Sequence, residues 1–232
     1  MSLVIDPYRF KLPAAAAEQS YQGLVAKTSQ TTLPITLNSV QTGAAATGRR
    51  IVCAIHWQNP SAAKTLSSAK IGGVPASILA QAVHSSQFVG AALIIADLDT
   101  GTSTDVEVTL ASGAPYYNVW VASYRVMGLL STTAIDPTTA TPTNATSVSL
   151  NIDEQDDGVR FAALMAYAGS SNFNPTGMTE RYDSSVAANH RAVGAGDDIT
   201  ATVAGKTITF TINNPGTGSF NGAAVAVSLR RS

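Results

Sequence analysis

The sequence predicts an all-β protein, an antiparallel β-sandwich of the jelly-roll or concanavalin-like type. Short apolar segments recur from Leu33 onward, about 8–12 residues apart, with turn-forming residues between them. Several of these segments alternate apolar and polar residues, which is typical of strands with one buried face. Because no apolar repeat of helical period persists for three turns, we expect little helix.

The predicted strands follow one another along the chain. The run 51–57 is almost wholly apolar, as expected of a strand that is covered on both faces. The segment 70–76 places Gly72 and Gly73 between two β-type stretches, which predicts a hairpin. The remaining predicted strands are 91–96, 105–110, 118–126, 147–152, 159–168, 207–212 and 223–229.

The order of these features repeats. The run 51–57 is matched by 159–167, and the alternating strand 105–110 is matched by 207–212. The Gly72-Gly73 turn likewise matches the Gly177 turn, and 118–126 matches 222–229. The offsets, about 102 to 108 residues, exceed the period of a solenoid. We therefore expect two duplicated halves that share one core, with the boundary near the Thr/Pro/Ala-rich stretch 131–146.

The first 30 residues differ from the rest of the chain. They carry Pro7, Pro13 and a run of alanines at 14–17, with little alternation. We expect an extended N-terminal arm over 1–30, used for attachment, and a single sandwich domain over 31–232. Arms of this kind are commonly ordered only by a neighbouring subunit. The predicted attachment residues are Leu3, Val4, Ile5, Tyr8 and Phe10.

Composition and charge exclude several classes of protein. Charged residues make up 12% of the 232 residues and the net charge is −1, which argues against a coiled coil. A nucleic-acid binder needs clustered Lys and Arg, and the densest clusters here are Arg49-Arg50 and Arg230-Arg231. The longest apolar runs are far shorter than a membrane span of about 20 residues, and no signal peptide is predicted. The single cysteine, Cys53, lies in an apolar run and is expected in the core.

The sequence contains no motif that predicts catalysis. His56, His84 and His190 are isolated and lack the spacing of zinc ligands. A serine nucleophile would need a Gly-x-Ser-x-Gly elbow, and no such pentapeptide occurs. The glycines of 194–196 precede the acids of 197–198, which would repel a phosphate. We therefore expect a non-enzymatic protein without a cofactor.

One acidic loop is a candidate cation site. The segment 153–158 has four acids in six residues, and Asp153, Asp156 and Asp157 could give Ca²⁺ the oxygen ligands that it prefers. The loop lacks the spacing of an EF-hand. The alternative interpretation is a solvated hairpin turn, in which Asp and Gly bond local backbone groups.

A cluster of aromatic residues is a candidate ligand-contact site. Tyr116 and Tyr117 follow the turn at 113–115, where exposed rings could stack on sugar faces. Asn172 and Asn174 lie in another loop-like stretch and would complete the contact tip. Aromatic residues in strand-like segments also pack into cores, and that alternative stays open for both tyrosines.

Several segments carry a resemblance to a known group of proteins. They are Gly48–Trp57, Ala69–Ala76, Ala91–Thr102, Asp105–Leu110 and Met178–Tyr182. Together they resemble structural proteins of tailed bacteriophages, found also in prophages and in gene-transfer particles of α-proteobacteria. The resemblance covers most of the chain from about residue 34 to the end, and the opening 1–10 is similar to the starts of phage minor structural proteins. It implies a β-sandwich component of the virion, a tail protein or a decoration or spike of the head, and it implies no active-site residues.

These observations predict a non-enzymatic virion protein, assembled in the cytoplasm of a bacterial host. We expect it to dock through its N-terminal arm onto other virion proteins, such as capsid, portal or tail components, and to form a homo-oligomer. The alternative is a virion adhesin that binds glycans of the host surface, and a hydrolase that uses two carboxylates comes third. Neither a nucleic acid nor a membrane is an expected partner.

Overall fold

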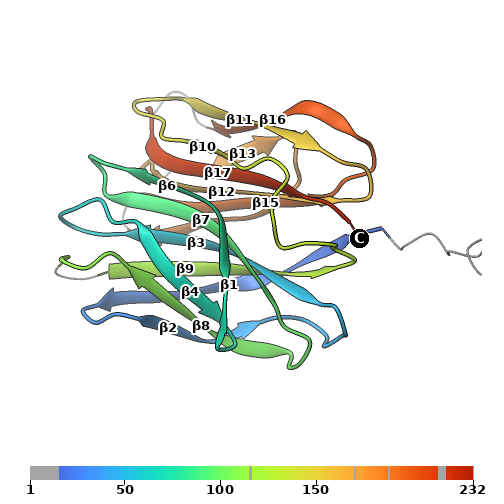
Figure 1. Cartoon of the computed structure of the whole chain (residues 1–232). Helices are drawn as coiled ribbons and strands as arrows, with labels where there is room; N and C mark the ends of the chain where they lie inside the picture. Colours follow the sequence, from blue (N-terminus) through green and yellow to red (C-terminus); the bar gives the residue numbers. More distant parts are fainter. Residues whose placement is uncertain (1–15, 115–116, 170, 188, 214–217, 232) are drawn as a thin grey trace, which may run out of the picture.

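The computed structural model describes residues 16–114, 117–169, 171–187, 189–213 and 218–231, and it confirms the predicted antiparallel all-β sandwich (Figure 1). The strands of the first half are β1 (Glu18–Gln30), β2 (Ile35–Gln41), β3 (Arg50–Gln58), β4 (Leu66–Ile71), β5 (Val74–Pro75), β6 (Ser77–His84), β7 (Val89–Asp97), β8 (Ser103–Leu110) and β9 (Tyr117–Met127). The strands of the second half are β10 (Thr138–Ala140), β11 (Ser147–Glu154), β12 (Val159–Tyr167), β13 (Phe173–Thr176), β14 (Glu180–Ala187), β15 (His190–Asp198), β16 (Val203–Ile212) and β17 (Asn221–Leu229).

The first half consists of two facing sheets. The larger has the order β1-β9-β3-β7-β6, and the smaller has the order β2-β8-β4-β5. In β8, Val106, Val108 and Leu110 alternate with polar residues and are buried between the two sheets. Pairing is nested, with β1 against β9, β2 against β8, β3 against β7 and β4 against β5. This nesting is the connectivity of a jelly roll.

The second half repeats the first. Its sheets have the orders β10-β17-β12-β15-β14 and β11-β16-β13, so each of its strands has a counterpart in the same place in the first half, where only β5 is additional. The register repeats as well: β3 pairs with β9 from Arg50↔Val126 to Gln58↔Asn118, and β12 pairs with β17 from Val159↔Leu229 to Tyr167↔Asn221. The duplication predicted from the order of sequence features is therefore confirmed, and the boundary lies in the segment between β9 and β11.

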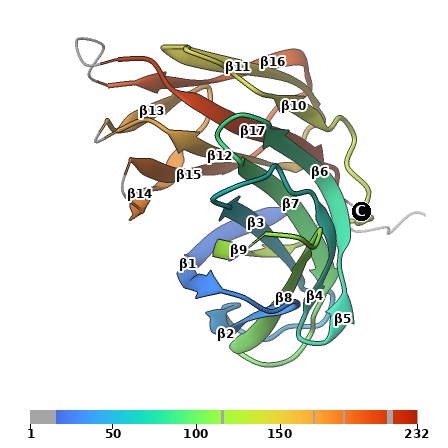
Figure 2. The same ribbon diagram turned by 90° about the vertical axis from the view of Figure 1, so that its left-hand side faces the viewer.

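The two jelly rolls pack with their larger sheets face to face, so the molecule has four sheets in layers (Figure 2). Each half has an apolar core between its own two sheets. A third cluster lies between the halves and is the core that they share. Across this shared core, β6 faces β10 and β17, and β1 faces β15. The strand order of one larger sheet therefore runs opposite to that of the other, as it does in two copies related by a two-fold axis.

The shared core has two sides. At the side that we call the narrow side, β17 lies against β6 and β7, and the cluster there contains Ala80, Ala82, Ala91 and Ala223. From there the sheets diverge toward β1 and β14, the wide side (Figure 2). The wide side is filled by rings, and its ring-to-ring contacts join Tyr21, Tyr124, Phe161, Tyr182 and His56.

Two of the largest rings lie over glycines of the neighbouring strand. Trp57 pairs with Gly90, where an added Cβ would lie 2.1 Å from the indole ring. Tyr182 pairs with Gly194, where an added Cβ would lie 2.3 Å from the phenol ring. A side chain at either glycine would therefore displace the ring, which explains why glycine occupies strand interiors that otherwise disfavour it.

The predicted arm and the predicted boundary both take part in the sheets. Of the predicted arm 1–30, residues 18–30 form β1 and pair with β9, whereas 1–15 lie outside the described residues. The stretch 131–146 contains β10, which covers the outer edge of β17, as β1 covers that of β9. Strand β1 went unrecognised because its residues are mostly half-buried or exposed and show no clear apolar alternation.

Candidate functional site

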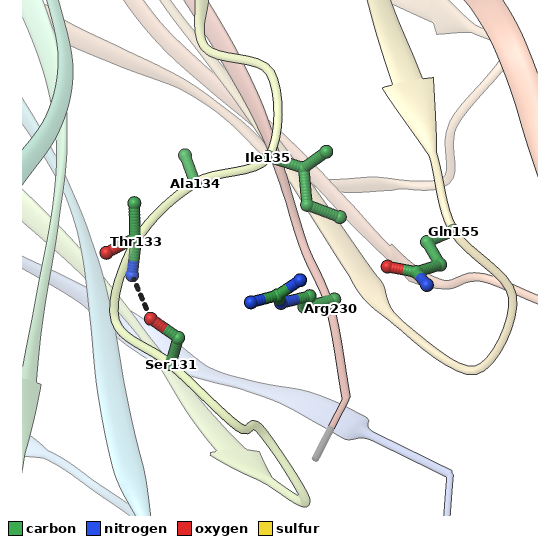
Figure 3. Close-up of a pocket in the computed structure, with 6 residues that line it drawn as sticks. All are labelled: Ser131, Thr133, Ala134, Ile135, Gln155 and Arg230. Atoms are coloured by element: carbon green, nitrogen blue, oxygen red, sulfur yellow. Dashed lines mark hydrogen bonds between the residues drawn. The ribbon is translucent and has the colours of Figure 1, made fainter.

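A concave surface lies where the linker between the two halves crosses from one to the other. The linker follows β9 and is tied to β17 by backbone hydrogen bonds, among them one from the amide of Ile135 to the carbonyl of Ser228, 2.9 Å apart. A pocket of about 300 Å³ lies beside it (Figure 3). The lining residues are Ser131, Thr133, Ala134, Ile135, Gln155 and Arg230.

A second pocket of about 210 Å³ adjoins the first, because both are lined by Thr133 and Ala134. It extends toward β6 through Ile78 and Leu79. We call the two pockets together the linker groove. Its full lining is Ser77, Ile78, Leu79, Ser131, Thr132, Thr133, Ala134, Ile135, Pro137, Gln155 and Arg230.

The linker groove is lined by both apolar and polar side chains and carries one cation. Figure 3 shows the side chain of Arg230 between the linker residues and Gln155. Within the described residues Arg230 makes no ion pair. The hydroxyl of Ser131 accepts a hydrogen bond from the amide of Thr133 at 3.0 Å, which shapes the turn of the linker. The groove thus offers a mixed apolar and polar surface with a guanidinium that has no ion-pair partner within the described residues.

A buried polar pair joins the two halves on the wide side. His56 Nε2 lies 2.7 Å from the hydroxyl of Tyr182, and His56 is fully buried. Burial lowers the pKa of His56 to about 3, so the imidazole is neutral, and burial raises the pKa of Tyr182. Because the pair is enclosed by rings and aliphatic side chains, its role is to hold the two sheets in register.

Cys53 lies in the core of the first half, as predicted. Its side chain is fully buried, and burial raises the pKa of the thiol to about 12. The thiolate that a nucleophile requires is therefore absent at neutral pH.

The acidic run 153–157 bonds to the protein itself. A carboxylate oxygen of Asp153 accepts from the amide of Gly205 at 2.7 Å, and one of Asp156 accepts from the amide of Asp157 at 2.9 Å. Asp157 pairs with Arg231. In the part of the chain that the structure describes, no three His, Cys, Asp or Glu side chains gather as metal ligands would. The bond between Asp156 and Asp157 is the local backbone bonding of the hairpin-turn interpretation, whereas Gly205 and Arg231 come from distant parts of the chain.

The predicted contact residues lie in different halves. Tyr116 lies outside the described residues, and Tyr117 is only 2% exposed, with its hydroxyl 3.2 Å from the carbonyl oxygen of Ala111. The ring of Tyr117 therefore belongs to the core of the first half and does not face solvent. Asn172 and Asn174 are exposed, at and beside β13 in the second half.

An exposed aromatic residue near those asparagines went unrecognised in the sequence. Tyr167 ends β12, is 37% exposed and forms an edge-on contact with His190, with ring centroids 5.2 Å apart. Its loop leads to Asn172. Tyr167 is the last residue of an apolar run in the sequence. A ring at such a position could have been predicted to lie at the exposed end of a strand.

The predicted attachment residues lie outside the described part of the chain: Leu3, Val4, Ile5, Tyr8 and Phe10. The first described residues enter the fold close to the linker groove. The amide of Ala17 donates to the carbonyl of Asp157 at 2.8 Å, and Asp157 pairs with Arg231. The neighbouring residues Gln155 and Arg230 line the groove.

Buried arginines are a second feature that the sequence did not indicate. Arg49 is fully buried and donates to backbone carbonyls, including those of Leu98 and Thr100 at 2.6 Å each. Arg160 pairs with Glu154 and Asp197 at the end of the second half. These hydrogen bonds and ion pairs fix loops and strand ends within the protein.

Comparison of the chain with protein-family models finds no match, and comparison with curated proteins finds none. Among the described residues there is no helix of the length and hydropathy that crossing a bilayer requires.

Proposed function

We propose that this chain is a non-enzymatic structural protein of a bacteriophage virion, associated with the tail or decorating the capsid. The observation that carries the proposal is the fusion of two jelly rolls through a fully buried face. Jelly rolls build viral capsids, and they also build lectins. The fold alone supports both functions by analogy, and the sequence resemblance to phage structural proteins favours the first.

The packing of the two larger sheets suits a structural protein that must resist mechanical force. The larger sheet of each half is covered on both faces, so strands β3, β7, β12 and β17 are buried almost throughout. Interiors packed in this way have low compressibility. A body of this kind can hold its shape outside a cell without disulfide bonds.

Attachment in this proposal runs through residues 1–15, because 18–30 belong to β1. Residues 1–15 include the apolar residues predicted to bind other virion proteins, such as capsid, portal or tail components. An extended segment can pair with the sheet edge of a neighbour through its main chain, and its side chains then add specificity.

The test is incorporation into particles. We expect a variant that lacks residues 2–15 to remain folded and soluble and to be missing from purified particles. A matched control replaces the same residues with a Gly/Ser segment of equal length, which keeps the length but removes the apolar side chains, and it should also be missing. Normal incorporation of either variant would overturn attachment through this segment.

A second candidate function is binding of host-surface glycans, and the exposure of Tyr167 favours it. Its ring, with Asn172 in the following loop, could stack on a sugar and bond its hydroxyls. The test is a glycan array with Tyr167→Ala, which should abolish any hits. Val203→Ala is the matched control, because Val203 is similarly exposed at 38% and pairs with Glu154, at the opposite end of the half. A blank array with the unmodified protein would contradict this function.

A further inference from the structure

Exposed apolar side chains of the linker lie at and beside the linker groove. Few large apolar side chains of the described residues are exposed, and two of them, Leu130 at 54% and Ile135 at 39%, lie on the linker itself. Both pockets adjoin the same stretch, as do the apolar side chains of Ile78 and Leu79. Apolar surface gathered in one concave place marks a binding site.

We infer that the linker groove binds the N-terminal segment of the same chain, residues 1–15, before the protein assembles with its partners. This inference concerns the free subunit, and it stands whether or not the chain is a virion protein. In the free subunit, residues 1–15 would occupy the linker groove. To attach the protein as proposed above, they would have to leave it.

The position at which the chain enters the fold supports this occupant. Ala17 is hydrogen-bonded to Asp157, which pairs with Arg231, and the adjacent Gln155 and Arg230 line the groove. The segment therefore starts at the rim of the groove. Fifteen extended residues reach about 50 Å, far more than the distance that docking requires.

The tether also favours the same chain over a second copy. A short tether holds its end at an effective concentration of about millimolar. A second copy would have to reach that concentration in solution to compete. Weak apolar contacts are therefore enough for docking within one molecule.

The chemistry of the segment matches the groove. Its apolar residues Leu3, Val4 and Ile5 precede Asp6, the only acid among the first fifteen residues. The groove offers the apolar side chains of Ile78, Leu79 and Ile135 among polar ones, and it holds Arg230, which makes no ion pair within the described residues. Pockets of about 300 and 210 Å³ can take a few large aliphatic or aromatic side chains, and Asp6 can then reach the guanidinium.

The experiment measures protection of the groove in the full chain. A Leu130→Cys variant is labelled with a maleimide, and the rate is followed by mass spectrometry. The native Cys53 is buried with a raised pKa and gives little background. We expect the label to react about tenfold more slowly in the full chain than after deletion of residues 2–12. This ratio corresponds to a segment that is docked about ten times as often as it is undocked.

Two controls make the result specific. A Val74→Cys variant places a thiol at another exposed apolar position, on β5 in the outer sheet of the first half, and its labelling should not change on deletion. Arg230→Asp should speed labelling of Leu130→Cys in the full chain, and adding Asp6→Arg should restore protection. Equal labelling of Leu130→Cys with and without the segment would overturn the inference, as would failure of this charge exchange.

Protein concentration separates the same chain from a second copy. Protection by the chain's own segment should not change with dilution. Protection that disappears on dilution, together with dimers in analytical ultracentrifugation, would overturn the assignment to the same chain. Loss of particle incorporation is a separate readout, so the proposed function can fail while this inference holds.

Discussion

The narrow and wide sides of the shared core join the same two sheets by different means. On the narrow side, alanines let β17 approach β6 and β7 closely. On the wide side the gap is filled by Tyr21, Tyr124, Phe161 and Tyr182, and His56 adds a hydrogen bond. Two halves with the same strand order thus meet at an angle, and side-chain volume sets that angle.

The difference teaches which substitutions each side tolerates. The narrow side joins closely spaced strands through alanines, so it should be sensitive to added atoms. The wide side depends on large rings, so it should be sensitive to removed atoms. Both sides are buried, and burial alone does not distinguish them.

The largest effect is expected from removing a ring on the wide side. Tyr182→Ala leaves a cavity between the halves and His56 without its partner, and we expect a loss of about 3–5 kcal/mol in the free energy of unfolding. Denaturant unfolding measures it. Tyr167→Ala is the control and should cost less than about 0.5 kcal/mol, because Tyr167 is exposed. Similar losses for the two variants would contradict the conclusion that the rings of the wide side hold the two halves together.

A smaller loss is expected from adding atoms on the narrow side. Ala223→Leu inserts three carbons where β17 faces the other sheet, and we expect it to cost about 1–3 kcal/mol. The exposed Ala201→Leu serves as the matched control and should be nearly neutral. An unchanged unfolding midpoint for Ala223→Leu would show that the narrow side has room to spare.

The pH dependence of stability isolates His56. Its pKa in the folded state is about 3, below the value of about 6.5 in unfolded chains. Between these values the unfolded state binds a proton that the native state does not, so stability is complete above about pH 6.5 and falls as pH decreases. From pH 6 to 5 this single proton accounts for at most about 1.4 kcal/mol.

The measurement compares the unfolding free energies of the wild type and His56→Gln over pH 7 to 4. The pH dependence of the unfolding free energy should be smaller in the variant by the contribution of one proton. The contribution of His84, whose pKa burial also lowers, should be the same in both proteins. Identical pH slopes for the two proteins would show that His56 is not buried as a neutral group.

Much of the fold could be predicted from the sequence, because strands covered on both faces read as nearly continuous apolar runs. The runs at 51–57 and 159–167 identified β3 and β12, and their order revealed the duplication. The four-sheet arrangement could not be predicted, since apolar runs do not say which sheet covers each face. Strand β1 also went unrecognised, because its polar residues depend on pairing with β9.

The sites were less predictable than the strands. Tyr117 and Tyr167 are both tyrosines at strand ends, and only the structure separates the buried ring from the exposed one. The linker groove combines residues from the linker, β6, the turn between β11 and β12 and the C-terminal end of the chain. Such a site has no local sequence pattern, because the fold alone brings these segments together.

The most direct test of the proposed function is a reconstruction of intact particles purified from cells that carry the gene for this chain. We predict density for a body of two stacked sandwiches on the tail or the head surface, with the end that bears Ala17 and the linker directed toward its binding partner. A particle reconstruction in which no density fits this body would contradict the proposal that the chain is a structural part of the virion.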